Sequence, residues 1–455
     1  MKKGNAPLTL GTADIGKLLT QYAVPAVIAM TAASLYNITD SIFIGHGVGP
    51  LALSGLAITF PIMNLAAAFG SLIGAGAAAL LSLRLGQKDY EAANVILGNV
   101  TVLNIIIGIF FSVISIIFLK PVLYFFGASA DTISYAYDFM LIILAGNVVT
   151  HMYMGLNALL RSAGHPKESM YATIYTVLIN IILNPLFIFG FGWGIRGSAA
   201  ATIISQIIML AWQIKFFAAP ESFIRFKKGI YRLKGDIVKG IISIGLAPFM
   251  LNASACVIVV LINKQLMFYG GDLAVGAFGI VNRVAFLFVM IVFGINIGMQ
   301  PIAGYNYGAG LYARVNEVLK KAVIIATAVM TFGFVIVELF PHAVSSIFTR
   351  DAGLADLTAS GLRIAFVLYP LVGFQMVVSS FFQSIGMAYK TIFLSLSRQV
   401  IFLIPLLFIL PKHLGLSGVW LSLPAADFFA CVISAWLLTK QLKLFKKQIQ
   451  KQEIA

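Results

Sequence analysis

Twelve apolar runs, each long enough to cross a membrane as a helix, constrain this chain more than any other feature. They fall at residues 18–46, 53–82, 94–119, 132–160, 169–190, 197–218, 238–263, 273–299, 317–340, 357–384, 391–410 and 415–438. A bilayer core about 30 Å thick needs roughly 20 apolar residues in a helix. Because 60% of the 455 residues are hydrophobic and only 10% are charged, the composition excludes a soluble fold. The sequence predicts an all-α polytopic membrane protein.

The Lys and Arg residues indicate the orientation of these helices. If both termini are cytoplasmic, 23 of the 31 fall in inner segments, 5 in outer segments and 3 within spans. Inner loops of membrane proteins are enriched in Lys and Arg, and this explains the net charge of +15 without a nucleic-acid partner. We therefore expect a multi-pass protein of the cytoplasmic (inner) membrane with both termini inside.

The two halves of the chain are repeats. Short motifs recur at a constant offset of 222 residues: Asp14-Ile15-x-Lys17 and Asp236-Ile237-x-Lys239, Gly86-x3-Tyr90 and Gly308-x3-Tyr312, Ser162-x-Gly164 and Ser384-x-Gly386. Six helices per repeat give both halves the same orientation, so we expect two parallel-oriented six-helix repeats around a central cavity. The expected domains are an N-terminal lobe (1–218), a cytoplasmic linker (219–237), a C-terminal lobe (238–438) and a basic tail (439–455).

Asp40 is the first candidate for a functional residue, because it lies inside the first apolar run. An ionisable residue within a span is costly and is often functional. Tyr36 precedes it by one helical turn. In the fifth and sixth runs Asn184 and Thr202 lie at the same depth as Asp40, and Asn180 lies one turn deeper. A carboxylate, two amides and a hydroxyl suit a proton or a hard monovalent cation. The alternatives are a solvated Asp40 near the interface and unrelated hydrogen bonds between helices.

The chain resembles the multidrug and toxic compound extrusion (MATE) transporters, in the branch with the DinF-like and MepA-like bacterial proteins. The resemblance covers essentially the whole chain. Its motifs are Asn37-x-x-Asp40, Gly45-x3-Pro50-x-Ala52-Leu53, Asn180-x3-Asn184-Pro185, Gln300-Pro301-x2-Gly304-Tyr305-Asn306-Tyr307-Gly308-Ala309, Phe382-Gln383-x2-Gly386 and Ser397-Arg398-Gln399-x5-Pro405.

The resemblance implies a cation and proton site at Asp40, Asn180, Asn184 and Thr202. The family pattern usually has a second carboxylate where this chain has Asn184, which argues against a coupling scheme with two carboxylates. The resemblance also makes Pro25 a hinge candidate. Pro185 removes a helical hydrogen bond next to Asn184 and is a second hinge candidate.

Further candidates are assigned from their place in the spans. Residues expected to line a substrate cavity are Asn37, Asn157, Gln206, Met30 and Met63. Arg398 and Asp427 have similar depths in neighbouring helices, so we expect a structural ion pair. Arg283 and Arg363 have no partner that the sequence identifies. We find no catalytic motif, no cofactor motif and no metal site apart from a sodium ion at Asp40.

These features predict a monomeric secondary active exporter that exchanges lipophilic cations for protons or sodium ions by alternating access. One alternative is a lipid-linked oligosaccharide flippase, which needs a basic cavity for a pyrophosphate. Arg283 and Arg363 keep that alternative open. A second alternative is an intramembrane enzyme or receptor, which the repeat and the missing catalytic motif disfavour.

Overall fold

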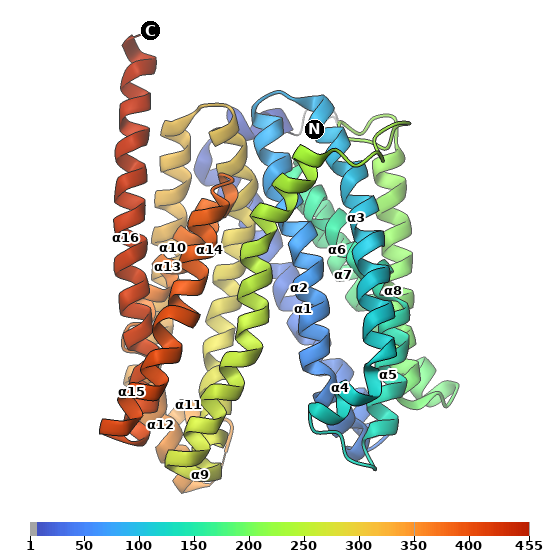
Figure 1. Ribbon diagram of the computed structural model, residues 1–455, viewed down its shortest axis with the longest axis vertical. Coiled ribbons are helices and arrows are strands. Elements are labelled where there is room, and N and C mark those ends of the chain that lie inside the picture. Colours follow the sequence, from blue (N-terminus) through green and yellow to red (C-terminus); the bar gives the residue numbers. More distant parts are fainter. Residues whose placement is uncertain (1–6, 350, 455) are drawn as a thin grey trace. The chain divides into compact units, whose positions relative to one another are not determined.

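The structure is a computed structural model that describes residues 7–349 and 351–454, without the side chains of residues 7, 37, 38, 256, 453 and 454. Every regular element in these residues is a helix (Figure 1). The first half forms η2 (Pro7–Gly11), α1 (Ile15–Gly47), α2 (Pro50–Gly86), α3 (Tyr90–Ile117), α4 (Leu119–Phe125), α5 (Ile133–Ala145), α6 (Asn147–Ser162), α7 (Pro166–Pro185), η3 (Leu186–Gly190) and α8 (Gly194–Ala218). The second half forms α9 (Gly235–Gly308), α10 (Tyr312–Leu339), α11 (Pro341–Ser346), α12 (Ala352–Phe366), α13 (Tyr369–Ser384), α14 (Ala388–Leu396), η4 (Ser397–Leu403), α15 (Ile404–Leu414) and α16 (Leu416–Ile454).

The described residues contain twelve membrane spans. Nine helices are long and apolar enough to cross a bilayer, and two further spans are the bent pairs α5–α6 and α12–α13. The twelfth comes from α9, whose 74 residues would make a helix about 111 Å long, far more than a bilayer needs. Gly271 has non-helical angles (φ 66°, ψ −165°) and divides α9 into two legs, which meet at the bottom of Figure 1. The prediction of a twelve-helix polytopic protein is confirmed.

The internal repeat is visible in the helix limits. α3 and α10 begin at Tyr90 and Tyr312, which are 222 positions apart, and their last residues have the same offset. α6 and α13 also correspond at both ends. The α5–α6 pair bends by 54° and the α12–α13 pair by 51°. The two-repeat architecture is therefore confirmed, whereas a central cavity between the repeats stays a prediction.

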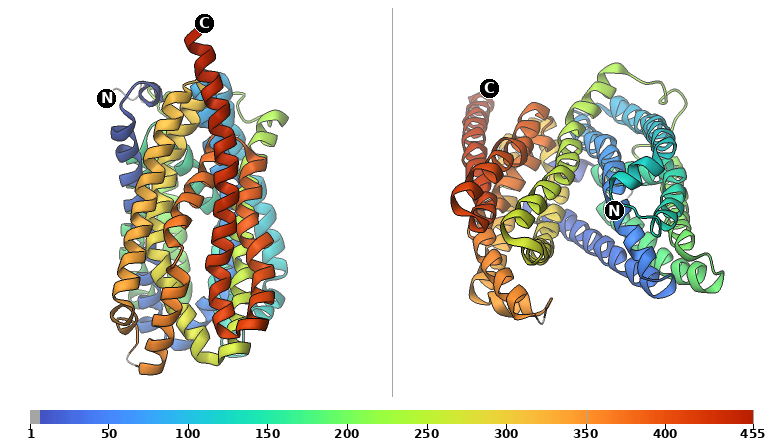
Figure 2. Two further views of the ribbon diagram at one scale, coloured as in Figure 1. Left: turned by 90° about the vertical axis from the view of Figure 1, so that its left-hand side faces the viewer. Right: turned by 60° about the horizontal axis from the view of Figure 1, so that its bottom comes forward.

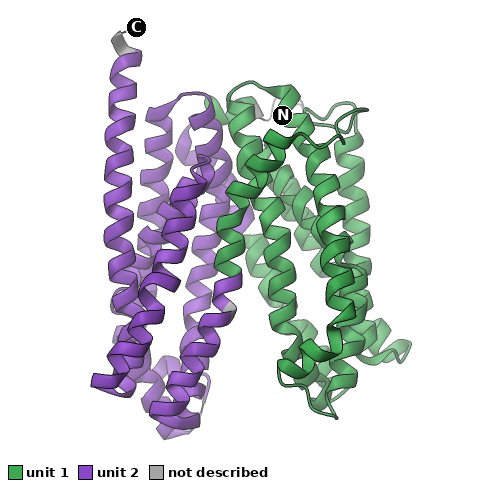
Figure 3. Cartoon of the chain, in the orientation of Figure 1, with its two compact units in different colours: residues 1–13, 28–252 green, residues 14–27, 253–455 purple. Residues whose placement is uncertain are grey.

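The chain forms two compact units, and two helices contribute to both of them (Figure 3). The first unit comprises residues 1–13 and 28–252, and the second comprises 14–27 and 253–455. The first part of α1 therefore belongs to the second unit, and the first part of α9 belongs to the first unit. The predicted domain limits, which follow the sequence repeat, stay a prediction.

Glycines allow the exchanged helix segments to pack closely within each unit. In the first unit a Cβ added at Gly245 of α9 would lie 1.7 Å from the carbonyl oxygen of Leu72 in α2. In the second unit a Cβ at Gly298 of α9 would lie 2.5 Å from the backbone nitrogen of Ala23 in α1. Small residues let membrane helices approach at backbone distance, and this favours their association by dispersion contacts.

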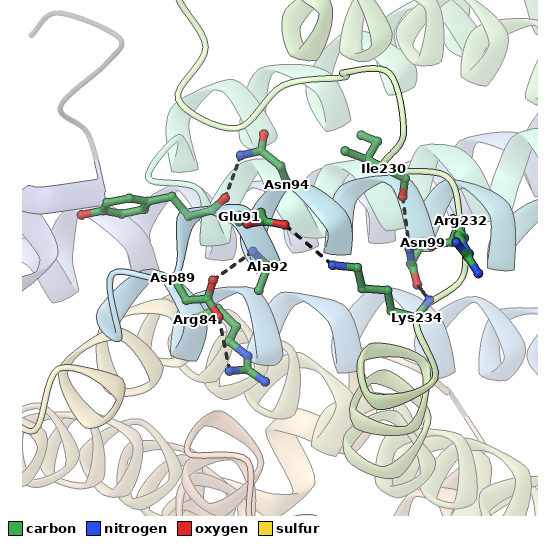
Figure 4. A network of polar contacts seen from close by, with 10 residues as sticks. Arg84, Asp89, Glu91, Ala92, Asn94, Asn99, Ile230, Arg232 and Lys234 are labelled. Atoms are coloured by element: carbon green, nitrogen blue, oxygen red, sulfur yellow. Dashed lines mark hydrogen bonds and ion pairs between the residues drawn. The ribbon is translucent and has the colours of Figure 1, made fainter.

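The segment between α8 and α9 is held against α3 by buried asparagines (Figure 4). Asn99 is fully buried, and its Nδ2 donates to the carbonyl oxygens of Ile230 (3.2 Å) and Arg232 (3.0 Å). Its Oδ1 accepts from the backbone nitrogen of Lys234 at 3.0 Å. One turn away, Asn94 Oδ1 accepts from the backbone nitrogen of Arg225 at 3.0 Å. These bonds satisfy backbone groups that a loop without regular structure would leave unpaired.

The last helix, α16, runs from Leu416 to Ile454 and is drawn in red in Figure 2. Residues 439–454, predicted as a basic tail, continue the helix. Phe445 in this extension is fully buried and stacks on Tyr312 of α10 with ring centroids 5.3 Å apart. The extension is therefore anchored by an apolar contact within the second unit.

Candidate functional site

The candidate site is built around Asp40 of α1, which is only 7% exposed. One of its carboxylate oxygens, Oδ1, accepts hydrogen bonds from Asn184 Nδ2 of α7 and from Ser198 Oγ of α8. Three helices of the first unit thus converge on one carboxylate. A buried charge without such donors would be strongly destabilising, so the two bonds allow an ionised Asp40 in this setting.

A second polar contact lies one helical turn along α1. Tyr36 Oη is 2.7 Å from Thr202 Oγ1 of α8, and Asn180 Nδ2 of α7 donates to the same oxygen at 3.3 Å. Thr202 donates its own hydroxyl proton to the Ser198 carbonyl at 3.1 Å. Because that proton is used, Tyr36 is the donor in its bond with Thr202. Ser198 links the two contacts, because its hydroxyl donates to Asp40 and its backbone carbonyl accepts from Thr202.

Asn184 retains an unused acceptor in this site. Its Oδ1 is buried and has no hydrogen-bond partner in the described part of the chain. An amide oxygen beside a carboxylate can accept the proton of a neutral Asp40, or it can coordinate a hard cation such as sodium. The residues present therefore fit either coupling ion.

Ser198 was missed by the sequence analysis. It precedes Thr202 by four residues on α8, so it lies on the same helix face one turn away. That spacing is the signal that could have identified it.

A small hollow borders Asp40. Met63 of α2, one of the predicted substrate-cavity residues, lines it together with apolar residues of α2 and α5. The other lining residues are Tyr36, Ser41, Leu56, Phe60, Phe139, Ile143 and Thr202. Phe139 and Leu56 belong to a buried apolar cluster of the first unit, and this cluster fixes the wall of the hollow.

Three other predicted cavity residues, Asn157, Gln206 and Met30, do not line this hollow. Gln206 accepts a hydrogen bond from Thr150 (2.6 Å), and Asn157 donates one to Thr173 (3.0 Å). Both bonds join neighbouring helices of the first unit. Met30 is half-buried on α1 and does not line the hollow. The side chain of Asn37 lies outside the described residues, so its predicted position stays a prediction.

The two candidate hinges lie in different places within their helices, one inside a helix and one at a helix end. Pro25 is buried inside the continuous helix α1, two residues before the boundary at which α1 passes from one unit to the other. Pro185 is the last residue of α7 and is followed directly by the π-helix η3. Prolines and π-helical turns are recognised places for a helix to bend.

In the second unit two arginines have a carboxylate partner, and the sequence predicted only one of these pairs. Arg398, on the π-helix η4, lies 2.5 Å (Nε to Oδ1) from the buried Asp427 of α16. Arg363 lies 3.9 Å from Glu338, a partner that the sequence did not suggest. Arg283 is exposed. Among the described residues there is no group of three or more His, Cys, Asp or Glu side chains that could hold a metal ion.

Comparisons with known proteins agree over most of the chain. The MatE family model matches residues 25–186 and 246–409, one segment in each repeat. Curated relatives include the multidrug export protein MepA of Staphylococcus haemolyticus, 24% identical over 93% of both chains. MepA of Staphylococcus aureus is 23% identical over 94% of both chains.

Solved structures give the same result. The MATE multidrug transporter DinF-BH, solved in complex with a ligand, is 36% identical, has a TM-score of 0.87, and is matched over 98% of its chain and 96% of this one. An outward-facing MATE family transporter of the MOP superfamily is 23% identical with a TM-score of 0.90, over 99% of its chain and 98% of this one. The second likeness shows the fold alone.

Proposed function

Because this chain belongs to the MatE family, we propose that it is a secondary active exporter of lipophilic cations, exchanged for protons or sodium ions by alternating access. The proposal is supported by its relatives, since MepA is named a multidrug export protein and DinF-BH is named a multidrug transporter. The multidrug activity named for those proteins supports the broad substrate range that we propose for this one.

The single observation that carries the proposal is the pairing of Asp40 with two donors and one unused acceptor. Ionised Asp40 is stabilised by Asn184 Nδ2 and Ser198 Oγ. If the Asn184 amide turns over, its oxygen takes the place of its nitrogen beside Asp40 and can accept the proton of the neutral carboxyl. A carboxylate that is accommodated in both charge states can take up and release a proton in each cycle.

The proposed cycle follows from this exchange of charge. A proton or sodium ion that enters from outside neutralises Asp40, so a bound cation loses its counter-charge and leaves. The membrane potential contributes about 2.3 kcal/mol per charge per 100 mV to this uptake. Pro25, beside the point where α1 passes between the units, is the proposed hinge, and Pro185 with η3 is the second.

The test is export from proteoliposomes with proton and sodium gradients imposed separately. We expect one of the two gradients to drive export of ethidium, a lipophilic cation, by the wild type, and Asp40→Asn to lose gradient-driven export. Asp138→Asn is the matched control, because Asp138 is a carboxylate of the same unit whose partner is the exposed Arg196 at 3.0 Å. Full export by the Asp40→Asn variant would exclude the proposed role.

We also propose that both termini are cytoplasmic, on the strength of the Lys and Arg distribution. Single cysteines placed at Lys120 and Lys412 should react with an impermeant reagent added outside the cell, and those at Lys228 and Lys447 should not. Labelling at Lys228 from outside would overturn this orientation.

The charges of the second unit give the flippase alternative little support. A pyrophosphate carries several charges and requires several free cations. Arg363 is near Glu338, so it is not a free cation. The enzyme and receptor alternatives are disfavoured because the curated relatives are export proteins.

A further inference from the structure

Three arginines lie within the predicted spans of the second unit, and two of them have a carboxylate neighbour. Arg398 is bonded to Asp427, and Arg363 lies near Glu338. Arg283, on the second leg of α9, has no hydrogen-bond or ion-pair partner within residues 7–349 and 351–454, and its side chain is exposed. The second unit therefore carries one uncompensated positive charge in its spans.

The depth of Arg283 determines what its exposed side chain can face. It lies 12 residues after Gly271, where the second leg of α9 begins, and this corresponds to about 18 Å of helix. Arg283 also lies three residues before the midpoint of the apolar run 273–299, the part of this leg that we expect to cross a bilayer core about 30 Å thick. A guanidinium at that depth is too costly to expose to hydrocarbon and faces either the protein interior or a water-filled cavity. Because Arg283 is exposed and has no partner among the described residues, a water-filled space is the setting that suits its charge.

On the helix face of Arg283, the neighbour on one side leaves open space and the neighbours on the other side are exposed apolar side chains. Gly279, one turn before it, leaves open space, since an added Cβ would meet nothing within 4 Å. Phe286 and Leu287, one turn after it, are 50% and 63% exposed. The face thus offers room beside a cation, followed by an apolar surface.

We propose that Arg283 binds the acidic group of an amphiphilic anion, a carboxylate, sulfonate or phosphate, whose hydrophobic part lies along Phe286 and Leu287. A guanidinium binds such groups through two parallel hydrogen bonds. The ligand supplies the counter-charge that Arg398 and Arg363 obtain from the chain itself. This assignment adds anionic and zwitterionic amphiphiles to the lipophilic cations proposed above.

The test measures binding and does not depend on export. Purified protein in phosphatidylcholine nanodiscs is titrated with a dansyl-labelled undecanoate, and the signal is compared with that of empty nanodiscs. We expect saturable binding by the wild type, and at least about tenfold weaker binding by Arg283→Gln, because a hydrogen-bonded ion pair is lost. Arg283→Lys should retain part of the affinity, since the charge remains and the paired geometry is lost.

Two further variants separate recognition from folding. Arg363→Gln, the matched control, removes an exposed arginine that has a carboxylate neighbour and should bind the probe as the wild type does. Gly279→Leu keeps the charge but fills the open space, and it should weaken binding of the same probe. Thermal unfolding of each variant shows whether the fold is retained.

Equal affinity of the wild type and Arg283→Gln, or no binding by the wild type, would overturn the assignment. Phosphatidylglycerol nanodiscs distinguish a soluble amphiphile from a lipid headgroup. If this lipid lowers the probe affinity of the wild type and Arg283→Gln removes that effect, Arg283 belongs to a lipid and the substrate assignment fails. None of these outcomes changes the expectation for cation export through Asp40, which the proteoliposome assay tests separately.

Discussion

The amide nitrogen of Asn184 donates a hydrogen bond to Oδ1 of Asp40, although the two residues are 144 positions apart in the sequence. Ser198 donates to the same oxygen from a third helix. The proposed coupling carboxylate therefore depends on how α7 and α8 pack against α1. Substitutions of these donors should change the response of transport to pH.

Replacing Asn184 should alter the pH dependence of transport. Asn184→Asp places a second carboxylate in contact with Asp40, and two like charges at that distance cannot both ionise easily. We expect the transport profile to move to higher pH and a second proton to be carried per cycle. Asn184→Leu should lower activity, because it removes a donor and an acceptor together. Transport rate against pH, measured in liposomes at fixed potential, checks both. An unchanged profile for Asn184→Asp would mean that residue 184 does not influence Asp40.

Breaking the ion pair in the second unit should destabilise the protein more than removing it. Asp427→Asn leaves the partly exposed Arg398 without its partner, at an expected cost of about 2–4 kcal/mol. The double variant with Arg398→Gln should recover part of this loss, since no charge is then left unpaired. The unfolding midpoints of both single variants and the double variant give the coupling energy. Independent, additive losses would argue against a structural pair.

Asn99 should hold the segment between the two repeats in place against α3. Asn99→Leu removes three hydrogen bonds from a fully buried position and leaves two backbone carbonyls and one backbone nitrogen without partners. We expect a loss of about 2–4 kcal/mol and faster trypsin cleavage at Lys227 and Lys228. Asn99→Asp keeps the acceptor for Lys234 but turns a carboxylate oxygen toward the Ile230 and Arg232 carbonyls, so it should destabilise the segment at least as much. Cleavage at the wild-type rate in Asn99→Leu would show that other contacts hold the segment.

The close helix packing of the first unit predicts a steric effect at Gly245. Gly245→Ala introduces a Cβ 1.7 Å from the Leu72 carbonyl oxygen, so the helices must separate. We expect a cost of about 1–3 kcal/mol, seen as a lower unfolding temperature in detergent. Gly235→Ala is the control, because a Cβ there meets nothing within 4 Å. If both variants were equally stable, α2 and α9 would not be in contact at this point.

Asp14 should make stability depend on pH at the start of α1. The backbone N–H of Lys17 donates to its carboxylate at 2.9 Å, and this bond is the main reason that the pKa of Asp14 is lowered. A lowered folded-state pKa gives stability that is present above the unfolded-state pKa and is lost as the pH falls through the folded-state value. We expect Asp14→Ala to unfold roughly 1–2 °C lower than the wild type at pH 7, with the difference shrinking under acidic conditions. If the difference in unfolding temperature between the wild type and Asp14→Ala did not change with pH, the Asp14 carboxylate would not act as a charged cap at the start of α1.

Some features of the protein follow from the sequence because they depend only on nearby residues. The spans are predictable because an apolar run long enough to cross a bilayer is a local property, and the repeat is predictable because a constant offset can be read along the chain. Even the two legs of α9 are separated correctly by their two apolar runs, since the polar segment around Asp272 interrupts them. The prominence of Asp40 has the same origin, as a carboxylate within an apolar run is visible without any tertiary information.

The tertiary structure decided which side chains meet. Helix depth placed Asn184 level with Asp40, but the rotation of α8 about its axis was needed to bring in Ser198, 158 positions away. The same holds for Glu338 beside Arg363, for the Asn99 contacts with the segment after α8, and for the division of α1 and α9 between two units. Each of these depends on contacts between segments distant in sequence. Hydrophobicity fixes how deep a helix lies in the membrane, whereas only packing against its neighbours fixes which of its faces they meet.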